Sequence, residues 1–103
     1  MKLLTKAIEK NLPALYANEK KHPRDIKVPL KMFSPWGSWT WYATEYDPET
    51  KTFFGWVDSE FPELGYFNLD ELESVSGPYG LKIERDMHWN PNNTLEYVMN
   101  LSR

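Results

Sequence analysis

Residues 83–89 (IERDMHW) carry side chains that could perform chemistry, because Glu84, Asp86 and His88 alternate along them. In an extended strand these three residues share one face, where two carboxylates and an imidazole could bind a divalent metal or form an acid–base set. Residues two apart in a strand are separated by about 6.5–7 Å, too far for all three to reach one ion unless the side chains converge. Alternation of wet and buried positions is the simpler explanation. We therefore expect no catalytic residue, no metal and no cofactor here.

Residues 34–48 (SPWGSWTWYATEYDP) contain three tryptophans, Trp36, Trp39 and Trp41. Such a cluster is either a platform on which bases or another flat ligand stack, or a large part of the core. The surrounding segment is acidic, which disfavours a platform for nucleic acid. We predict that Trp39 and Trp41, on one face of a strand, are buried. Trp36 lies in a loop between proline and glycine, and we expect it to be exposed and suited to anchor a protein interface.

Charge is distributed unevenly along the chain, although the net charge is only −3. Residues 1–33 carry eight Lys/Arg and three Asp/Glu, whereas residues 34–80 carry nine Asp/Glu and a single lysine, Lys51. Residues 81–103 carry three of each sign. The asymmetry indicates an acidic face and a basic face, unless the segments interleave in space so that the field averages out.

The chain has 103 residues, of which 41% are hydrophobic and 16% aromatic, and it contains no cysteine. This length predicts one domain, residues 1–103, with a core that is rich in aromatic side chains. The absence of cysteine excludes disulfides, thiolate nucleophiles and Cys-based zinc sites. Residues 1–12 lack the apolar run of a signal peptide or a membrane span. We expect a cytoplasmic monomer that makes no membrane contact.

Helical and extended patterns alternate in the first third of the chain. Apolar residues at helical spacing predict a kinked helix, or two short ones, from a Thr5 cap to about Glu19, with the kink at Pro13. Residues 27–33 predict a strand. Because Pro29 cannot donate a backbone hydrogen bond, this strand is expected at an edge of the sheet or with a bulge.

The middle of the chain contains the firmest local pattern. Residues 39–46 and 51–58 predict a hairpin, joined by a DPET turn with Asp47 at its first position. Residues 59–67 are expected to cross irregularly to the next element. Residues 68–74 predict a short helix capped by its leading asparagine.

The C-terminal part predicts a further strand, residues 81–89, and a terminal helical turn or two at residues 94–100. Both faces of the predicted hairpin carry aromatic residues, so both faces of the sheet are expected to be partly covered. Together the elements predict an α+β fold. It would have an antiparallel sheet of about four strands with a central hairpin, packed by an N-terminal helix and short C-terminal helices.

Several longer phrases are familiar together: MKLLT…LPALY, WTWYATEYDP, FFGWV, ELGYFNLDELESV and GPYGLKIERDMHWNP. From Met1 to about Pro91 the chain resembles the bacterial family named domain of unknown function 2958. The resemblance implies a small protein of plasmids, phages or other mobile elements, and it brings no established catalytic residue. It also implies a link to the type II anti-CRISPR proteins, which inhibit an RNA-guided DNA nuclease. Residues 92–103 match no motif of the family.

Two non-enzymatic function classes remain. The first is an inhibitor that docks on the basic, nucleic-acid-binding surface of a type II CRISPR nuclease or its guide-loaded complex, with carboxylates in place of phosphates. The second is a nucleic-acid-binding accessory protein of a plasmid or phage, which uses the basic N-terminal third. Its phosphate contacts would be Lys20, Lys21, Arg24, Lys27 and Lys31. A mobile-element housekeeping domain without a defence role is a third interpretation.

For the inhibitor, the predicted partner-binding residues are exposed acids on the hairpin, its exit loop and the following helix, with one aromatic anchor. They are Glu45, Asp47, Glu49, Asp58, Glu60 and Glu63, then Asp70, Glu71 and Glu73, with Trp36 at the edge. We expect no strong binding of duplex DNA by the protein alone, because neighbouring carboxylates would repel the phosphate backbone.

Overall fold

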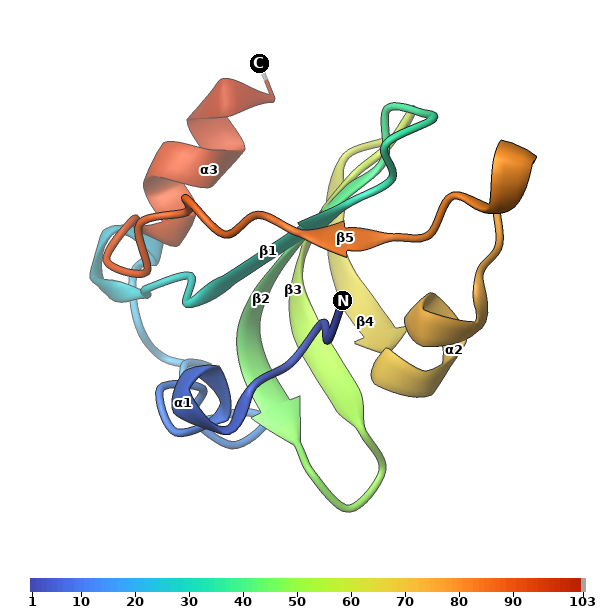
Figure 1. Cartoon of the computed structure of the whole chain (residues 1–103). Helices are drawn as coiled ribbons and strands as arrows, with labels where there is room; N and C mark the ends of the chain where they lie inside the picture. Colours follow the sequence, from blue (N-terminus) through green and yellow to red (C-terminus); the bar gives the residue numbers. More distant parts are fainter. Residues whose placement is uncertain (103) are drawn as a thin grey trace.

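The computed structural model describes residues 1–102, which form an antiparallel sheet of five strands in the order β4-β3-β2-β1-β5 (Figure 1). The strands are β1 (Leu30–Phe33), β2 (Thr40–Asp47), β3 (Thr52–Asp58), β4 (Glu63–Asn68) and β5 (Glu84–Arg85). The helices are α1 (Lys6–Glu9), α2 (Leu69–Ser74) and α3 (Leu95–Leu101), with the 3₁₀ turns η1 (Pro23–Asp25) and η2 (Pro78–Gly80). The α+β class is confirmed, with five strands where about four are predicted.

The predicted hairpin is β2 and β3, and it lies at the centre of the sheet. Its turn follows the DPET pattern. The Asp47 carboxylate accepts hydrogen bonds from the Glu49 amide and the Thr50 hydroxyl, both at 3.0 Å. Lys51 then adopts a positive φ of 58°, which returns the chain into β3. The turn projects at the bottom of Figure 1, beside α2.

The strand that the sequence does not predict is β4, which lies within the expected irregular crossing. Its alternation is short and is interrupted by Gly65, so the sequence pattern is weak. Packing against the neighbouring strand stabilises the extended conformation that local sequence does not favour. Phe67 pairs with Phe53 of β3, and the two rings stack with their centroids 5.4 Å apart. The edge of the sheet is thus defined by aromatic packing rather than by local propensity.

Three other predicted elements differ in extent. The N-terminal helix is only α1, capped by Thr5, whose hydroxyl accepts from the Ile8 amide at 3.2 Å. Turns replace the predicted helix beyond it, because Pro13 disfavours helical continuation. The predicted strand 81–89 shortens to β5. Strand β1 begins directly after Pro29 and is not at the edge, since β5 pairs with it.

Separate apolar clusters cover the two faces of the sheet. On one face Trp41 and Ala43 pack with residues of α2 and of the N-terminal segment. On the other face Tyr42 packs with Leu95 and Val98 of α3. The larger cluster contains Leu3, Leu4, Leu12, Leu30, Met32, Trp41, Ala43, Tyr46, Phe53, Phe67, Leu69, Leu72 and Ile83. Burial on both faces agrees with the aromatic residues predicted on both.

A β-bulge at Thr44 changes which residues face the larger cluster. Ala43 pairs with Gly55 and Glu45 pairs with Phe54, so Thr44 is the extra residue in β2. Regular alternation predicts that Glu45 shares a face with Ala43. Because a bulge shifts the alternation by one residue, Tyr46 joins that face instead. Glu45 turns to the opposite face.

Candidate functional site

Glu45 is the first of the predicted contact residues, and its predicted exposure is wrong, since it is only 4% exposed. Its Oε1 accepts from the Tyr16 amide and its Oε2 from the Asn18 amide, both at 2.8 Å. The Asn18 side chain in turn donates to the Thr44 carbonyl at 3.3 Å. The carboxylate therefore attaches the turn segment 14–21 to β2 and cannot belong to an exposed acidic surface.

Five of the predicted acids gather at the end of the sheet formed by the β2–β3 turn and α2. Lys51 Nζ lies 3.3 Å from Asp70 Oδ1, and Asn68 Nδ2 donates to the Thr50 carbonyl at 3.0 Å, so the helix is tied to the turn. Asn68 also caps α2 as predicted, by accepting from the Glu71 amide. We name this region the hairpin-end acidic surface. Its members are Asp47, Glu49, Asp70, Glu71 and Glu73.

The phenol of Tyr46 lies within the negative potential of the carboxylates at this end of the sheet. Burial raises the pKa of its hydroxyl, and nearby carboxylates raise that pKa further. These carboxylates are Glu9, Asp70, Asp47 and Glu73. Because α1, the β2–β3 turn and α2 all act on one phenol, acids that are distant in sequence converge around one point.

Asp58, Glu60 and Glu63 lie at the other end of the sheet, around the β3–β4 turn. Strand β3 has seven residues and spans about 20 Å between the two turns. The acids predicted on the hairpin and its exit loop are therefore divided between the two ends of the sheet. Tyr42 is influenced by this second end of the sheet. Burial is the main reason that the pKa of its hydroxyl is raised, and the Asp58 carboxylate raises that pKa further.

Trp36 is not the exposed aromatic that the sequence predicts. It is partly buried against the larger cluster, and its indole covers Gly77, where an added Cβ would come within 2.5 Å of the ring. The predicted burial of Trp39 is wrong: Trp39 is 41% exposed, because it precedes β2 and leaves the covered part of the sheet. Trp41 is buried as predicted, at 9% exposure.

Lys31 is partly exposed, and its amine is engaged by an acid and two aromatic rings. Its Nζ lies 3.5 Å from Asp86 Oδ2. The same nitrogen lies 5.3 Å from the centroid of the Trp89 ring and 5.7 Å from that of the Tyr42 ring. These contacts remove Lys31 from the predicted set of phosphate contacts.

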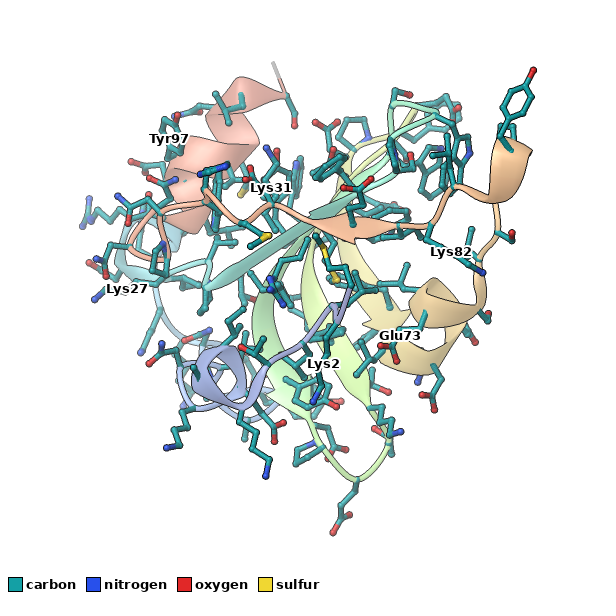
Figure 2. All side chains as sticks on the ribbon, viewed as in Figure 1. Lys2, Lys27, Lys31, Glu73, Lys82 and Tyr97 are labelled. Atoms are coloured by element: carbon teal, nitrogen blue, oxygen red, sulfur yellow. The ribbon has the colours of Figure 1, made fainter. Side chains whose placement is uncertain are left out.

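The other predicted phosphate contacts lie on exposed turns near η1. They are Lys20, Lys21, Arg24 and Lys27. In Figure 2, Lys27 lies at the left and Glu73 lies right of the centre, where Lys2 and Lys82 are also labelled; Glu73 and Lys82 line one shallow pocket.

The segment with Glu84, Asp86 and His88 does not form the regular strand on which a shared face depends. The chain leaves β5 after Arg85 and bends at Asp86, whose Oδ1 accepts from the His88 amide at 2.9 Å. The other carboxylate oxygen of Asp86 pairs with Lys31. Within the described residues, no group of three or more His, Cys, Asp or Glu is placed to hold a metal ion.

Sequence reasoning misses a groove on the face of the sheet that carries α3. It has a volume of about 280 Å³, and its lining includes Tyr16, Phe54 and Tyr66 as well as Glu45. Alternation in β3 does place Phe54 on this face. The bulge that turns Glu45 inward and the turn that carries Tyr16 leave no recognisable pattern in the sequence.

Comparisons with known proteins bear on the family alone. No helix in the described part of the chain has the length and apolar character needed to cross a membrane. A search of curated proteins and a search of solved structures each return no match. The family described as "Protein of unknown function (DUF2958)" matches residues 3–103, including the last twelve residues, in which no family motif was recognised. The chain therefore belongs to the DUF2958 family.

Proposed function

We propose that this protein acts without catalysis, by binding a protein that handles nucleic acid through a basic surface. The most specific target that we propose is the nuclease of a type II CRISPR system, free or loaded with its guide. The observation that carries the proposal is the hairpin-end acidic surface, where five carboxylates come from the β2–β3 turn and α2 and the adjoining Lys51 is paired with Asp70. The resemblance to mobile-element proteins supplies the biological context, since such elements gain from blocking host defence.

The chemistry of such an inhibitor follows from the distribution of charge. A nuclease channel lined by lysine and arginine attracts phosphates, and carboxylates at similar spacing can occupy it in their place. Asp47 is fixed by the turn hydrogen bonds that it accepts, and α2 is tied to the turn by the Lys51–Asp70 pair, so the carboxylates are presented on a defined backbone. Attraction of this kind raises the association rate and weakens as salt is added.

Reversing the charge of this surface is expected to abolish inhibition while the fold remains intact. The variant is Glu49→Lys with Glu71→Lys and Glu73→Lys, three exposed positions that form no ion pair with any residue of the described range 1–102. The measurement is cleavage of target DNA by guide-loaded nuclease as a function of inhibitor concentration, with a thermal melt of each protein. The half-inhibitory concentration should rise by about 100-fold or more, since several charge pairs are replaced by repulsion.

The matched control has the same net charge but changes acids elsewhere. Asp25→Lys with Glu60→Lys and Glu63→Lys alters three exposed carboxylates outside the hairpin end. It should inhibit nearly as well as the unmodified protein. If the control alone loses inhibition, the contact lies outside the hairpin end. If excess folded protein leaves cleavage unchanged across several type II enzymes, the proposed target is wrong.

A nucleic-acid accessory function is the second candidate, favoured by the exposed group Lys20, Lys21, Arg24 and Lys27. We predict weak binding to duplex DNA, because this group is small and Lys31 is engaged with Asp86. A mobility-shift assay at physiological salt should show no complex at micromolar protein. Tight binding that is lost when the four basic residues are changed to alanine would instead support the accessory function.

A further inference from the structure

The groove on the α3 side of the sheet is built from three strands and the turn segment 14–21. Its volume is about 280 Å³. The lining is mainly apolar and aromatic, with a carboxylate among its residues, a composition typical of ligand sites. The lining includes Tyr16, Glu19, Lys21, Glu45, Phe54 and Tyr66.

The buried carboxylate in this groove is that of Glu45, which is 4% exposed and has no cationic partner among the described residues. Its two oxygens accept one backbone hydrogen bond each, from Tyr16 and Asn18, although a carboxylate can accept about four. The Lys–carboxylate ion pairs among residues 1–102 are Lys31–Asp86 and Lys51–Asp70, and neither involves Glu45. A buried carboxylate without a cation is costly, so the groove favours a ligand that brings a positive charge.

Aromatic rings form the walls above this carboxylate. Phe54 and Tyr66 meet edge to face, with centroids 5.0 Å apart and an interplanar angle of 61°. The Tyr66 hydroxyl donates to the Tyr16 hydroxyl at 3.4 Å, and this bond raises the pKa of Tyr66. Tyr16 and Tyr66 remain 64% and 55% exposed, so their rings are available at the mouth of the groove. Rings of this kind attract a cation that approaches their faces.

The backbone around the groove departs from regular geometry at two separate places. Tyr16 has a φ of 72°, an uncommon conformation for a residue with a large side chain. Glu45 holds it there by accepting from its amide. The bulge at Thr44 turns Glu45 toward the groove, and bulges of this kind often redirect a side chain beside a functional site. The conformation of Tyr16 and the bulge at Thr44 thus position the Glu45 carboxylate and the aromatic ring of Tyr16 in the same groove.

We propose that this groove binds the side chain of an arginine presented by the protein partner. The proposal rests on the proposed function, since it names how that partner is held. The guanidinium would lie against Tyr66 and Phe54 and donate to the free acceptor positions of Glu45. Two further charges line the groove, those of Glu19 and Lys21, and they cancel, so the net charge facing the ligand is that of Glu45.

Arginine fits this groove better than lysine or an apolar side chain. Its planar guanidinium stacks on aromatic rings and is weakly hydrated, so that it enters a partly apolar groove at lower cost than a compact ammonium. It also offers several N–H donors, which match the two oxygens of one carboxylate. An apolar side chain would fill the volume but leave Glu45 without a cation. Proteins that bind nucleic acid carry many exposed arginines, which connects the groove to the proposed class of partner.

The test is a titration of isotope-labelled protein with N-acetyl-arginine methylamide, followed by amide NMR. The amides of Tyr16 and Asn18 donate to Glu45 and should shift in a saturable way. The matched probe is the citrulline analogue, which has nearly the same shape and no charge. It should bind at least about tenfold more weakly, because the charge-assisted bonds to Glu45 are lost.

Variants identify the groove as the site of binding. Glu45→Gln should weaken arginine binding at least about tenfold. Because that change could disturb the fold, Tyr66→Ala provides a second variant at an exposed position, with an expected loss of several-fold. Tyr79→Ala is the control, since Tyr79 is fully exposed on η2 and does not line the groove. Lys21→Ala, which removes the cation at the rim, should strengthen binding.

The proposal is overturned if citrulline and arginine bind equally, if the shifts appear away from the groove, or if Tyr66→Ala binds arginine like the unmodified protein. The titration uses no nuclease, so its result is independent of inhibition. Inhibition by the unmodified protein without arginine binding would remove the groove proposal and leave the function. Arginine binding without inhibition would remove the proposed inhibitory function and leave the groove as an arginine-binding site.

Discussion

Replacing Gly55 with alanine is expected to destabilise the protein by more than about 4 kcal/mol, a large fraction of the stability of a small domain. Gly55 lies in the centre of β3, opposite Ala43 of β2. An added Cβ would lie 1.8 Å from the Tyr42 carbonyl oxygen and 2.9 Å from its carbonyl carbon. Both are backbone atoms of the neighbouring strand and cannot rotate away, so the central hairpin would have to separate. Urea unfolding followed by tryptophan fluorescence measures the loss.

Gly65→Ala is the matched control, because Gly65 is the partner of Gly55 in the next strand. A Cβ at Gly65 meets nothing within 4 Å. The change should therefore alter the free energy of unfolding by no more than about 0.5 kcal/mol, with a small gain from the reduced entropy of the unfolded chain. Equal destabilisation by the two variants would show that intrinsic strand preference, rather than contact with β2, decides the outcome.

The sequence predicts those parts of the fold whose signals are local. The DPET turn is correct because the Asp47 carboxylate closes it within three residues. The caps at Thr5 and Asn68 are correct for the same reason, since each side chain accepts from an amide three residues ahead. Such interactions depend on neighbours in sequence and need no knowledge of the sheet.

The parts that the sequence does not predict depend on contacts between distant strands. Strand β4 is stabilised by the pairing of Phe67 with Phe53, which local composition cannot reveal. The bulge at Thr44 inserts one residue and exchanges the faces of Glu45 and Tyr46. Because alternation has a period of two, one inserted residue reverses every later assignment in the strand.

The candidate site shows the same division. The sequence correctly identifies residues 45–73 as acidic, but it cannot show which acids lie together. The order of the strands places Asp47 and Glu49 beside α2, and the length of β3 separates them from Glu60. Glu45 belongs to neither group, because the bulge turns it into the groove. Charge composition is thus readable from sequence, whereas the shape of a charged surface requires the topology.

The second large effect is expected from Trp41→Ala, which should destabilise the protein by about 3–5 kcal/mol, the range for loss of a buried large aromatic side chain. Trp41 is 9% exposed and lies in the middle of β2, paired with Val57 on one side and Met32 on the other. Its truncation would leave a cavity between the sheet and the N-terminal segment. Chemical unfolding, followed by far-ultraviolet circular dichroism so that loss of the fluorophore does not matter, measures the change.

Trp39→Ala separates a structural role from a binding platform. The indole rings of Trp39 and Trp41 are adjacent, with centroids 5.9 Å apart, yet Trp39 is 41% exposed. A stacking platform requires both rings to face a ligand, whereas a core role requires burial that only Trp41 has. Trp39→Ala should therefore change stability by less than about 1 kcal/mol. If Trp41→Ala instead keeps the melting temperature and loses only partner binding, as a platform would require, the core assignment of Trp41 is wrong. With the expected results, the three tryptophans within six residues have three different roles. Trp41 fills the core, Trp36 covers Gly77, and Trp39 faces solvent.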